Sequence, residues 1–309
     1  MAGLYEPPVA AAGTVACAHA RSDSGCARAE VMRVIDCLHL GRARVIGSWQ
    51  VGGVLIDPGP SSCLPTLLGE LGDWRPQALL LTHIHLDHAG ASGSLVRRWP
   101  DLEVYVHERG ARHMADPARL LDSAKRLYGD DMDRLWGEFI AVPQAQLRIL
   151  HGGERLSLGG AEFEVAYTPG HASHHVSYLC DGTAFVGDVG GVRTADGGPA
   201  IPPTPPPDVD LEAWHRSLEL IAAWAPKRLA ITHFGAEENV DAHLAQVADR
   251  LDEWAELALE NDEQQFSEAV MAELLSSVTP AMIGAYQQAA PLDQCYAGLR
   301  RYWQKRGSL

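Results

Sequence analysis

A chain of 309 residues that is 46% hydrophobic and 21% charged has the composition of an ordinary globular protein of about two domains. Acidic residues outnumber basic ones 40 to 25, and the formal charge of −15 argues against a nucleic-acid partner. The six cysteines are scattered without a Cys-x-x-Cys pair, so we expect reduced thiols and a cytoplasmic location. Because no apolar stretch reaches the ~18 residues of a membrane span, we expect no membrane partner.

The chain is predicted to begin with an extension. Residues 1–31 are rich in alanine and their start lacks the positive charge of a signal peptide, so we predict a disordered segment. The run that begins at Met32 also fits a natural start, which would place residues 1–31 outside the native protein. Two short strands, 45–49 and 54–56, then flank a Gly-Gly turn, and a helix follows over 64–71.

The next segment, 78–88, contains a dense cluster of histidines and an aspartate. The apolar run 78–81 predicts a buried strand, and it leads into His83-Ile84-His85-Leu86-Asp87-His88. Alternation along an extended chain directs His83 and His85 to the same side, and the following loop brings Asp87 and His88 round to a second position. Imidazole nitrogens and carboxylate oxygens are ligands that zinc, iron and manganese accept. The segment therefore predicts a metal centre.

Further candidate ligands follow later strands. The intervening elements are predicted as a helix over 91–99, a strand over 103–106, a helical insertion over 111–140 and a strand over 146–150. A strand over 163–167 then leads to His171, a hairpin of 176–180 and 183–186 leads to Asp188, and a strand over 228–232 leads to His233. These residues and the first cluster give seven ligands at one sheet edge, the number that two ions need.

Two further segments bear on the architecture. The proline-rich tract 199–207 cannot be a helix or a central strand, and it is either a linker or a wall of the site. A helix is predicted over 210–224, and strands and helices alternate over about 43–235, which indicates an α/β fold. Apolar residues then recur at helical spacing, first over 244–257 and again over 263–275, 280–288 and 292–305. We therefore divide the chain into an extension (1–31), an α/β catalytic domain (32–236) and a C-terminal helical extension (237–309).

The ordered motifs resemble those of metallo-β-lactamase-fold hydrolases, on the glyoxalase II and lactonase side. The residues that carry this resemblance are Thr82-His83-x-His85-x-Asp87-His88-Ala89-Gly90, Thr168-Pro169-Gly170-His171, Gly187-Asp188 and Thr232-His233. The resemblance implies a four-layer αβ/βα sandwich with metals at one edge of the sheets. It also implies the ligand sets: His83, His85 and His171 for one ion, Asp87, His88 and His233 for the other, with Asp188 bridging both. The C-terminal helices would help to shape the substrate pocket.

The expected function follows from this resemblance. We predict a hydrolase of a small ester, thioester or lactone that uses two divalent ions, zinc first with iron or manganese also suitable, and a bridging hydroxide as nucleophile. Asp87 is the candidate catalytic residue, as acceptor or relay of a proton. Two alternatives of the same fold stay open: a persulfide dioxygenase with a single iron, and a non-catalytic effector. The expected partner is a small-molecule substrate, and a homodimer is possible.

The remaining histidines and several aromatic residues complete the predictions. His175 is a candidate to orient a ligand, while His174 replaces the small residue common at that position in the family. We expect the other histidines to be surface or core groups: His19, His39, His107, His113, His151, His215 and His243. The candidates to line a cavity are Trp49, Tyr128, Trp136, Phe139 and Phe234.

Overall fold

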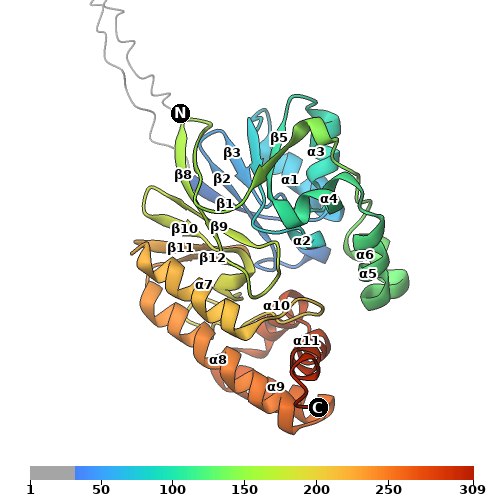
Figure 1. Cartoon of the computed structure of the whole chain (residues 1–309), viewed down its shortest axis with the longest axis vertical. Helices are drawn as coiled ribbons and strands as arrows, with labels where there is room; N and C mark the ends of the chain where they lie inside the picture. Colours follow the sequence, from blue (N-terminus) through green and yellow to red (C-terminus); the bar gives the residue numbers. More distant parts are fainter. Residues whose placement is uncertain (1–31) are drawn as a thin grey trace, which may run out of the picture.

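Two six-stranded sheets pack face to face, with helices on both outer sides (Figure 1). The computed structural model describes residues 32–309, so the predicted extension 1–31 lies outside the described residues. One sheet has the order β1-β2-β3-β4-β5-β6 and the other the order β12-β11-β10-β9-β8-β7. This arrangement confirms the α/β class, the four-layer αβ/βα sandwich and the helical C-terminal region.

The strands are short, and the longest helices lie in the C-terminal third. The strands are β1 (Met32–Asp36), β2 (Gly47–Val51), β3 (Val54–Ile56), β4 (Ala78–Leu80), β5 (Glu103–His107), β6 (Leu147–Leu150), β7 (Arg155–Leu158), β8 (Ala161–Tyr167), β9 (Val176–Cys180), β10 (Thr183–Phe185), β11 (Arg228–Ile231) and β12 (Gly235–Glu237). The α-helices are α1 (Leu64–Leu71), α2 (Leu86–Ala89), α3 (Ser92–Arg98), α4 (Glu108–Ala115), α5 (Ala118–Tyr128), α6 (Met132–Leu135), α7 (Leu211–Ala223), α8 (Val240–Glu260), α9 (Glu263–Ser277), α10 (Pro280–Ala289) and α11 (Leu292–Lys305). The short 3-10 helices are η1 (His39–Gly41), η2 (Ser61–Cys63), η3 (Gly129–Asp131), η4 (Gln144–Gln146) and η5 (Gly187–Gly190).

The space between the sheets is filled by apolar side chains from both. Val54 and Ile56 of β3 belong to the same buried cluster as Phe163 and Val165 of β8. Within each strand these residues are two apart, so they share one face of their sheet. Burial of each such side chain contributes about 1.5–3 kcal/mol. The interface fixes the two sheets relative to each other, and with them the loops at the sheet edge.

Each outer face is covered by its own set of helices. On the first sheet, α1, α3 and α4 bury residues such as Leu67, Leu95 and Met114. On the second sheet, α7 packs Trp214 into a core that also contains Trp254 of α8 and residues of α9, α10 and α11. The C-terminal helices therefore share one hydrophobic core with the second sheet. The domain boundaries at 32–236 and 237–309 stay a prediction.

Most predicted elements are present, and the differences are local. The predicted strand 45–49 is shifted to β2, because the chain before it bends at Arg44 (φ 62°) and Gly47 donates its N–H to the Thr232 carbonyl. The predicted helical insertion 111–140 ends at Leu135 and is divided into α4, α5 and α6. The strands β1, β7 and β12 were not predicted, and each lies at the edge of its sheet.

Parallel pairing brings several strand ends to one side of the sandwich. Strand β4 is parallel to its neighbours β3 and β5, and β10 is parallel to β11. The loops that leave β4, β10 and β11 therefore start at carboxyl ends, where parallel sheets commonly bind ligands. In the described part of the chain, no helix is long and apolar enough to cross a membrane. The same part contains no disulfide, and its four cysteines are buried.

Candidate metal centre

All seven predicted ligands lie together at this sheet edge. The chain leaves β4 through His83 and His85, and the one-turn helix α2 then presents Asp87 and His88. The loop after β8 carries His171, η5 after β10 carries Asp188, and the loop after β11 carries His233. Five of them are almost fully buried, whereas His85 and Asp87 are partly exposed. The structure thus brings together residues that are up to 150 positions apart in the sequence.

The ligand atoms form two groups of candidate metal ligands. His83, His85, His171 and Asp188 form one group, and Asp87, His88 and His233 form the other, with all ligand atoms of a group within 4.8 Å of one another. In the first group, His171 Nε2 lies 2.9 Å from His85 Nδ1. An ion with bonds of about 2.0–2.2 Å holds neighbouring ligand atoms roughly 3–3.5 Å apart. The spacing therefore fits a metal-binding His/Asp cluster.

Asp188 connects the two groups through its separate oxygens. Oδ2 lies 3.2 Å from His171 Nε2 and 3.9 Å from His83 Nε2. Oδ1 lies 3.0 Å from His88 Nε2 and 3.4 Å from His233 Nε2. One carboxylate therefore faces both groups, as a bridging ligand must.

Unpaired buried atoms support the fit to a metal. The Nε2 atoms of His83, His88 and His233 and the Oδ1 atom of Asp188 are buried without a hydrogen bond. Buried polar atoms are almost always paired, because an unpaired one costs about 1–3 kcal/mol. Four such atoms directed at one place are the donor set that a cation would satisfy.

The opposite ring nitrogens of these histidines are tied to acceptors. Nδ1 of His88 contacts Asp57 Oδ2 at 2.8 Å, Nδ1 of His171 contacts the Pro203 carbonyl at 2.8 Å, and Nδ1 of His233 contacts the Val45 carbonyl at 2.5 Å. An acceptor at Nδ1 keeps the proton there and leaves the Nε2 lone pair for a metal. The protein thus fixes three rings in the ligand tautomer.

Asp57 is the functional residue that the sequence did not indicate. Its buried carboxylate accepts the backbone N–H and the hydroxyl of Thr82, the hydroxyl of Thr232 and the Nδ1–H of His88. The sequence Asp57-Pro58-Gly59-Pro60 is typical of a turn, and this turn signal concealed it. A weaker signal existed, since Asp57 follows the apolar strand β3 directly, as the histidine cluster follows β4.

Burial and the two carboxylates set the protonation of the cluster. Burial lowers the pKa of His83 well below its usual value and, with His171 nearby, lowers that of His85 to about 4. Burial opposes protonation of His233, but Asp188 and Asp87 raise its pKa to about 9. For Asp188, burial would raise the pKa, but His88 and His171 hold it well below the usual value. His83 and His85 are therefore neutral and Asp188 is ionised, which are the forms that bind metal ions, whereas His233 would release its proton when an ion binds.

The other histidines differ in their relation to the site. The ring of His175 lies 5.2 Å from that of His83, but its side-chain hydrogen bond joins Nδ1 and the Thr168 hydroxyl at 2.9 Å. It therefore packs beside a ligand without hydrogen bonding to one. His174 is stacked on His83 at 6.1 Å and lines the cavity beside His85. His39 and His113 also line that cavity, so two histidines expected as surface or core groups face it.

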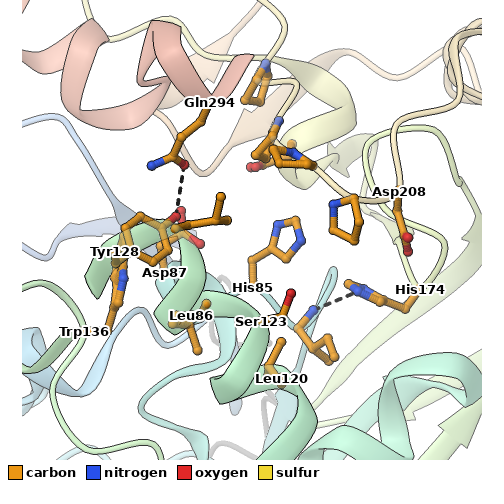
Figure 2. Close-up of a pocket in the computed structure, with 18 of the residues that line it drawn as sticks. His85, Leu86, Asp87, Leu120, Ser123, Tyr128, Trp136, His174, Asp208 and Gln294 are labelled. Atoms are coloured by element: carbon orange, nitrogen blue, oxygen red, sulfur yellow. Dashed lines mark hydrogen bonds between the residues drawn. The ribbon is translucent and has the colours of Figure 1, made fainter. Parts of the chain in front are cut away.

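A cavity of about 940 Å³ lies in front of this cluster. Figure 2 shows His85, Asp87, Ser123 and Tyr128 pointing into it. Of the predicted aromatic lining residues, Tyr128 and Trp136 line the cavity, whereas Trp49 belongs to the core between the sheets. Prolines of the tract 199–207 form part of the wall, as one of the two interpretations of that tract predicted. Gln294 of α11 completes the opposite side and accepts a hydrogen bond from Tyr128 at 3.2 Å.

The comparisons with known proteins agree with this geometry. The family model of the metallo-beta-lactamase superfamily matches residues 52–233, more than half of the chain. The metallo-beta-lactamase fold-containing protein ST1585 of Sulfurisphaera tokodaii is 29% identical over 201 residues, which cover 63% of this chain and 74% of that protein. A hydroxyacylglutathione hydrolase of Yersinia enterocolitica is 31% identical over 135 residues, 44% of this chain. That match spans only 41% of the length of the Yersinia protein.

Solved structures agree on the fold. The crystal structure of ST1585 superposes with a TM-score of 0.63 at 24% identity, covering 83% of this chain and 93% of that one. The metallo-beta-lactamase family protein TTHA1429 of Thermus thermophilus superposes with a TM-score of 0.62 at 21% identity, covering 85% and 89%. At these identities the likeness establishes the fold alone.

Proposed function

This chain belongs to the metallo-beta-lactamase superfamily, and on that basis we propose that it is a dinuclear metal-dependent hydrolase of a small ester, thioester or lactone. The observation that carries the proposal is the pair of ligand groups joined by Asp188. Two sets of this kind suit two ions, whereas a dioxygenase with a single iron would need only one of them. Relatives named hydroxyacylglutathione hydrolase favour a thioester, since an acyl group on a thiol is a thioester.

Zinc is the proposed metal, and iron and manganese also suit imidazole and carboxylate ligands. When bound, such ions polarise a carbonyl oxygen and lower the pKa of bound water from 15.7 to about 7. The cytoplasmic location, the small-molecule substrate and a possible homodimer stay predictions.

The chain's own residues would orient the reaction and move its proton. Asp188 would hold both halves of the centre together, and its side chain is only 5% exposed. The Asp87 side chain is 20% exposed and lines the cavity, and its Oδ2 lies 3.5 Å from His233 Nε2. We propose that Asp87 accepts or relays the proton from the attacking water. Leu86, Tyr128 and Trp136 would shield the reacting bond from bulk water.

Metal content per chain, measured by mass spectrometry on untagged protein purified without a chelator, tests the proposal first. Two ions per chain together with hydrolysis of a thioester, ester or lactone would support it. One iron per chain and no hydrolysis would contradict it and would favour the dioxygenase.

The Asp87→Asn variant tests the catalytic role. We expect kcat to fall by about 100-fold or more, because general acid–base catalysis contributes about 10²–10⁴-fold. Metal content is measured beside activity, and Asp122→Asn on the exposed part of α5 is the matched control. Two retained ions with unchanged kcat in Asp87→Asn would show that Asp87 carries no proton in the reaction.

A further inference from the structure

Two helices of the insertion turn a positively charged side toward the cavity. Arg109 and Arg112 of α4 and Arg119 and Arg126 of α5 all line it. Residues three or seven apart in a helix lie on the same side, so each pair projects from one side of its helix. The four arginines make this part of the cavity positively charged, although the whole chain has a formal charge of −15.

These arginines have no acidic partner. Within residues 32–309, none of the four has a carboxylate oxygen within 4.0 Å, whereas Arg148 and Arg250, for example, each pair with a glutamate. Arg112 donates to His113 Nε2 at 3.2 Å, and the Arg109 guanidinium lies 5.8 Å from the ring centre of Tyr167. Neither contact neutralises charge.

The acidic residues that line the cavity contact other partners than these arginines. Apart from the metal centre, Glu108 and Asp208 are the acidic residues that line the cavity. Glu108 pairs with His151 Nδ1 at 3.2 Å, and Asp208 accepts the hydroxyl of Ser173 at 2.6 Å. Among residues 32–309, neither carboxylate forms an ion pair with any of the four guanidinium groups, so these groups are available to contact a ligand.

The same cavity connects this charge to the metal centre. His85 and Asp87 line it as well, and Leu120 and Ala124 of α5 supply an uncharged stretch of lining. Figure 2 shows Leu120 and Ser123 of α5 on the same side of the cavity as His85. Because the arginines and two candidate metal ligands line the same cavity, one bound molecule could contact both.

We propose that the four arginines bind a phosphate-bearing part of the substrate, which makes the preferred substrate a thioester of a phosphorylated thiol. The proposal rests on the hydrolase function proposed above for the reacting bond. Guanidinium groups bind phosphate through paired, charge-assisted hydrogen bonds. A cationic cleft in an otherwise acidic protein also raises the local concentration of anions at the cavity.

Two thioesters with the same acyl group and the same reacting thiol arm test this inference. Acetyl-coenzyme A carries phosphates, and S-acetylpantetheine lacks them. With the metal-loaded enzyme, we expect a higher kcat/KM for acetyl-coenzyme A and a decline of this preference as salt increases. The Arg119→Gln/Arg126→Gln variant should lose about tenfold or more in kcat/KM for acetyl-coenzyme A, mainly through KM, and less than about twofold for S-acetylpantetheine.

The control variant is Arg97→Gln, an exposed arginine of α3 that does not line the cavity, and it should leave both substrates unchanged. Equal losses for both substrates in the double variant would show that the arginines only support the fold. No loss for either substrate, or a higher kcat/KM for an acetylated glutathione than for acetyl-coenzyme A, would also overturn the inference.

Binding of stable thioethers separates this inference from the proposed function. S-ethyl-coenzyme A and S-ethylpantetheine cannot be hydrolysed, and calorimetry measures their affinity whether or not the enzyme acts on thioesters. Tighter binding of S-ethyl-coenzyme A that is lost in the double variant supports the phosphate site even if no thioester is hydrolysed. Equal binding of both thioethers overturns it even if thioesters are hydrolysed.

Discussion

Asp57 supports the candidate metal centre from outside the set of candidate ligands. Its carboxylate accepts four hydrogen bonds from Thr82, Thr232 and His88, which lie in the segments that follow β4 and β11. Thr82 in turn lies 3.1 Å from His83 Nδ1, so the same network reaches a ligand of each group. Removal of one charged acceptor would therefore loosen both groups.

Exchange of this carboxylate for an amide should weaken metal binding without changing the shape of the side chain. In Asp57→Asn, one acceptor oxygen becomes a donor, so either His88 or Thr82 loses its partner. We expect metal affinity to fall by about 10–100-fold, the range found when partners of metal ligands are removed. Competition with a coloured chelator measures it. Asp36→Asn, which alters a carboxylate that accepts the Leu38 and Arg44 N–H groups, is the control, and equal affinities in the two variants would contradict the prediction.

The sequence predicted the candidate ligands but not Asp57, the residue that holds one of them by a hydrogen bond. Each of the seven follows an apolar strand or belongs to the dense cluster 83–88, so spacing alone indicated them. Asp57 acts through contacts with residues 25 to 175 positions away, and these exist only once the sheets have packed. The residues that flank Asp57 in the sequence do not indicate these distant hydrogen-bond partners.

At the scale of elements, the unpredicted strands share one cause. Strands β1, β7 and β12 lie at sheet edges, where one side has no neighbouring strand. β7 alternates between exposed and half-buried residues, and β12 contains only three residues. Their extended form depends on pairing with β2, β8 and β11, which a local pattern does not contain. Central strands such as β4 and β9 are apolar and buried, and the sequence predicted both.

One close contact between elements positions His171. Gly170 has φ +141°, and a Cβ there would lie 2.4 Å from the Cα of Trp214 in α7. Asp210, the N-cap of α7, donates its N–H to the Gly170 carbonyl at 2.9 Å. The ligand loop therefore lies directly against the helix backbone, which leaves no room for a side chain.

Gly170→Ala should separate this loop from α7 and displace His171. We expect the free energy of unfolding to fall by about 3 kcal/mol, from overpacking and backbone strain together. Thermal unfolding and metal content measure the effect. Gly72 at the end of α1 also has a positive φ (56°), but a Cβ there would meet no atom within 4 Å, so Gly72→Ala should lose about 1–2 kcal/mol from backbone strain alone. Equal losses in the two variants would show that the contact with α7 does not matter.

At the scale of the whole molecule, the C-terminal helices line the cavity of the candidate metal centre and also pack into the hydrophobic core of the second sheet. Residues of α10 and α11 line the cavity opposite α5, including Gln288 and Gln294. His243 of α8 is fully buried and its Nε2 lies 2.7 Å from the carbonyl of Gly190, in the same short helix as Asp188. The neutral ring donates this hydrogen bond across the boundary between the predicted domain and its extension.

This buried histidine should make the stability of the whole chain depend on pH. Burial lowers the pKa of His243 to about 4, below the ordinary value of 6.5. The unfolded chain therefore takes up a proton at this site at a higher pH than the folded chain does. The contribution to stability is complete above pH 6.5 and declines as the pH falls toward 4, by about 2 kcal/mol between pH 7.5 and 5.

His243→Gln isolates this contribution, because glutamine can donate to the Gly190 carbonyl but does not titrate in this range. Chemical unfolding of the metal-loaded proteins at both pH values gives the free energies. The variant should lose about 2 kcal/mol less than the native protein when the pH falls from 7.5 to 5. An identical decline in the native protein and in His243→Gln would show that α8 holds η5 without a pH-sensitive hydrogen bond.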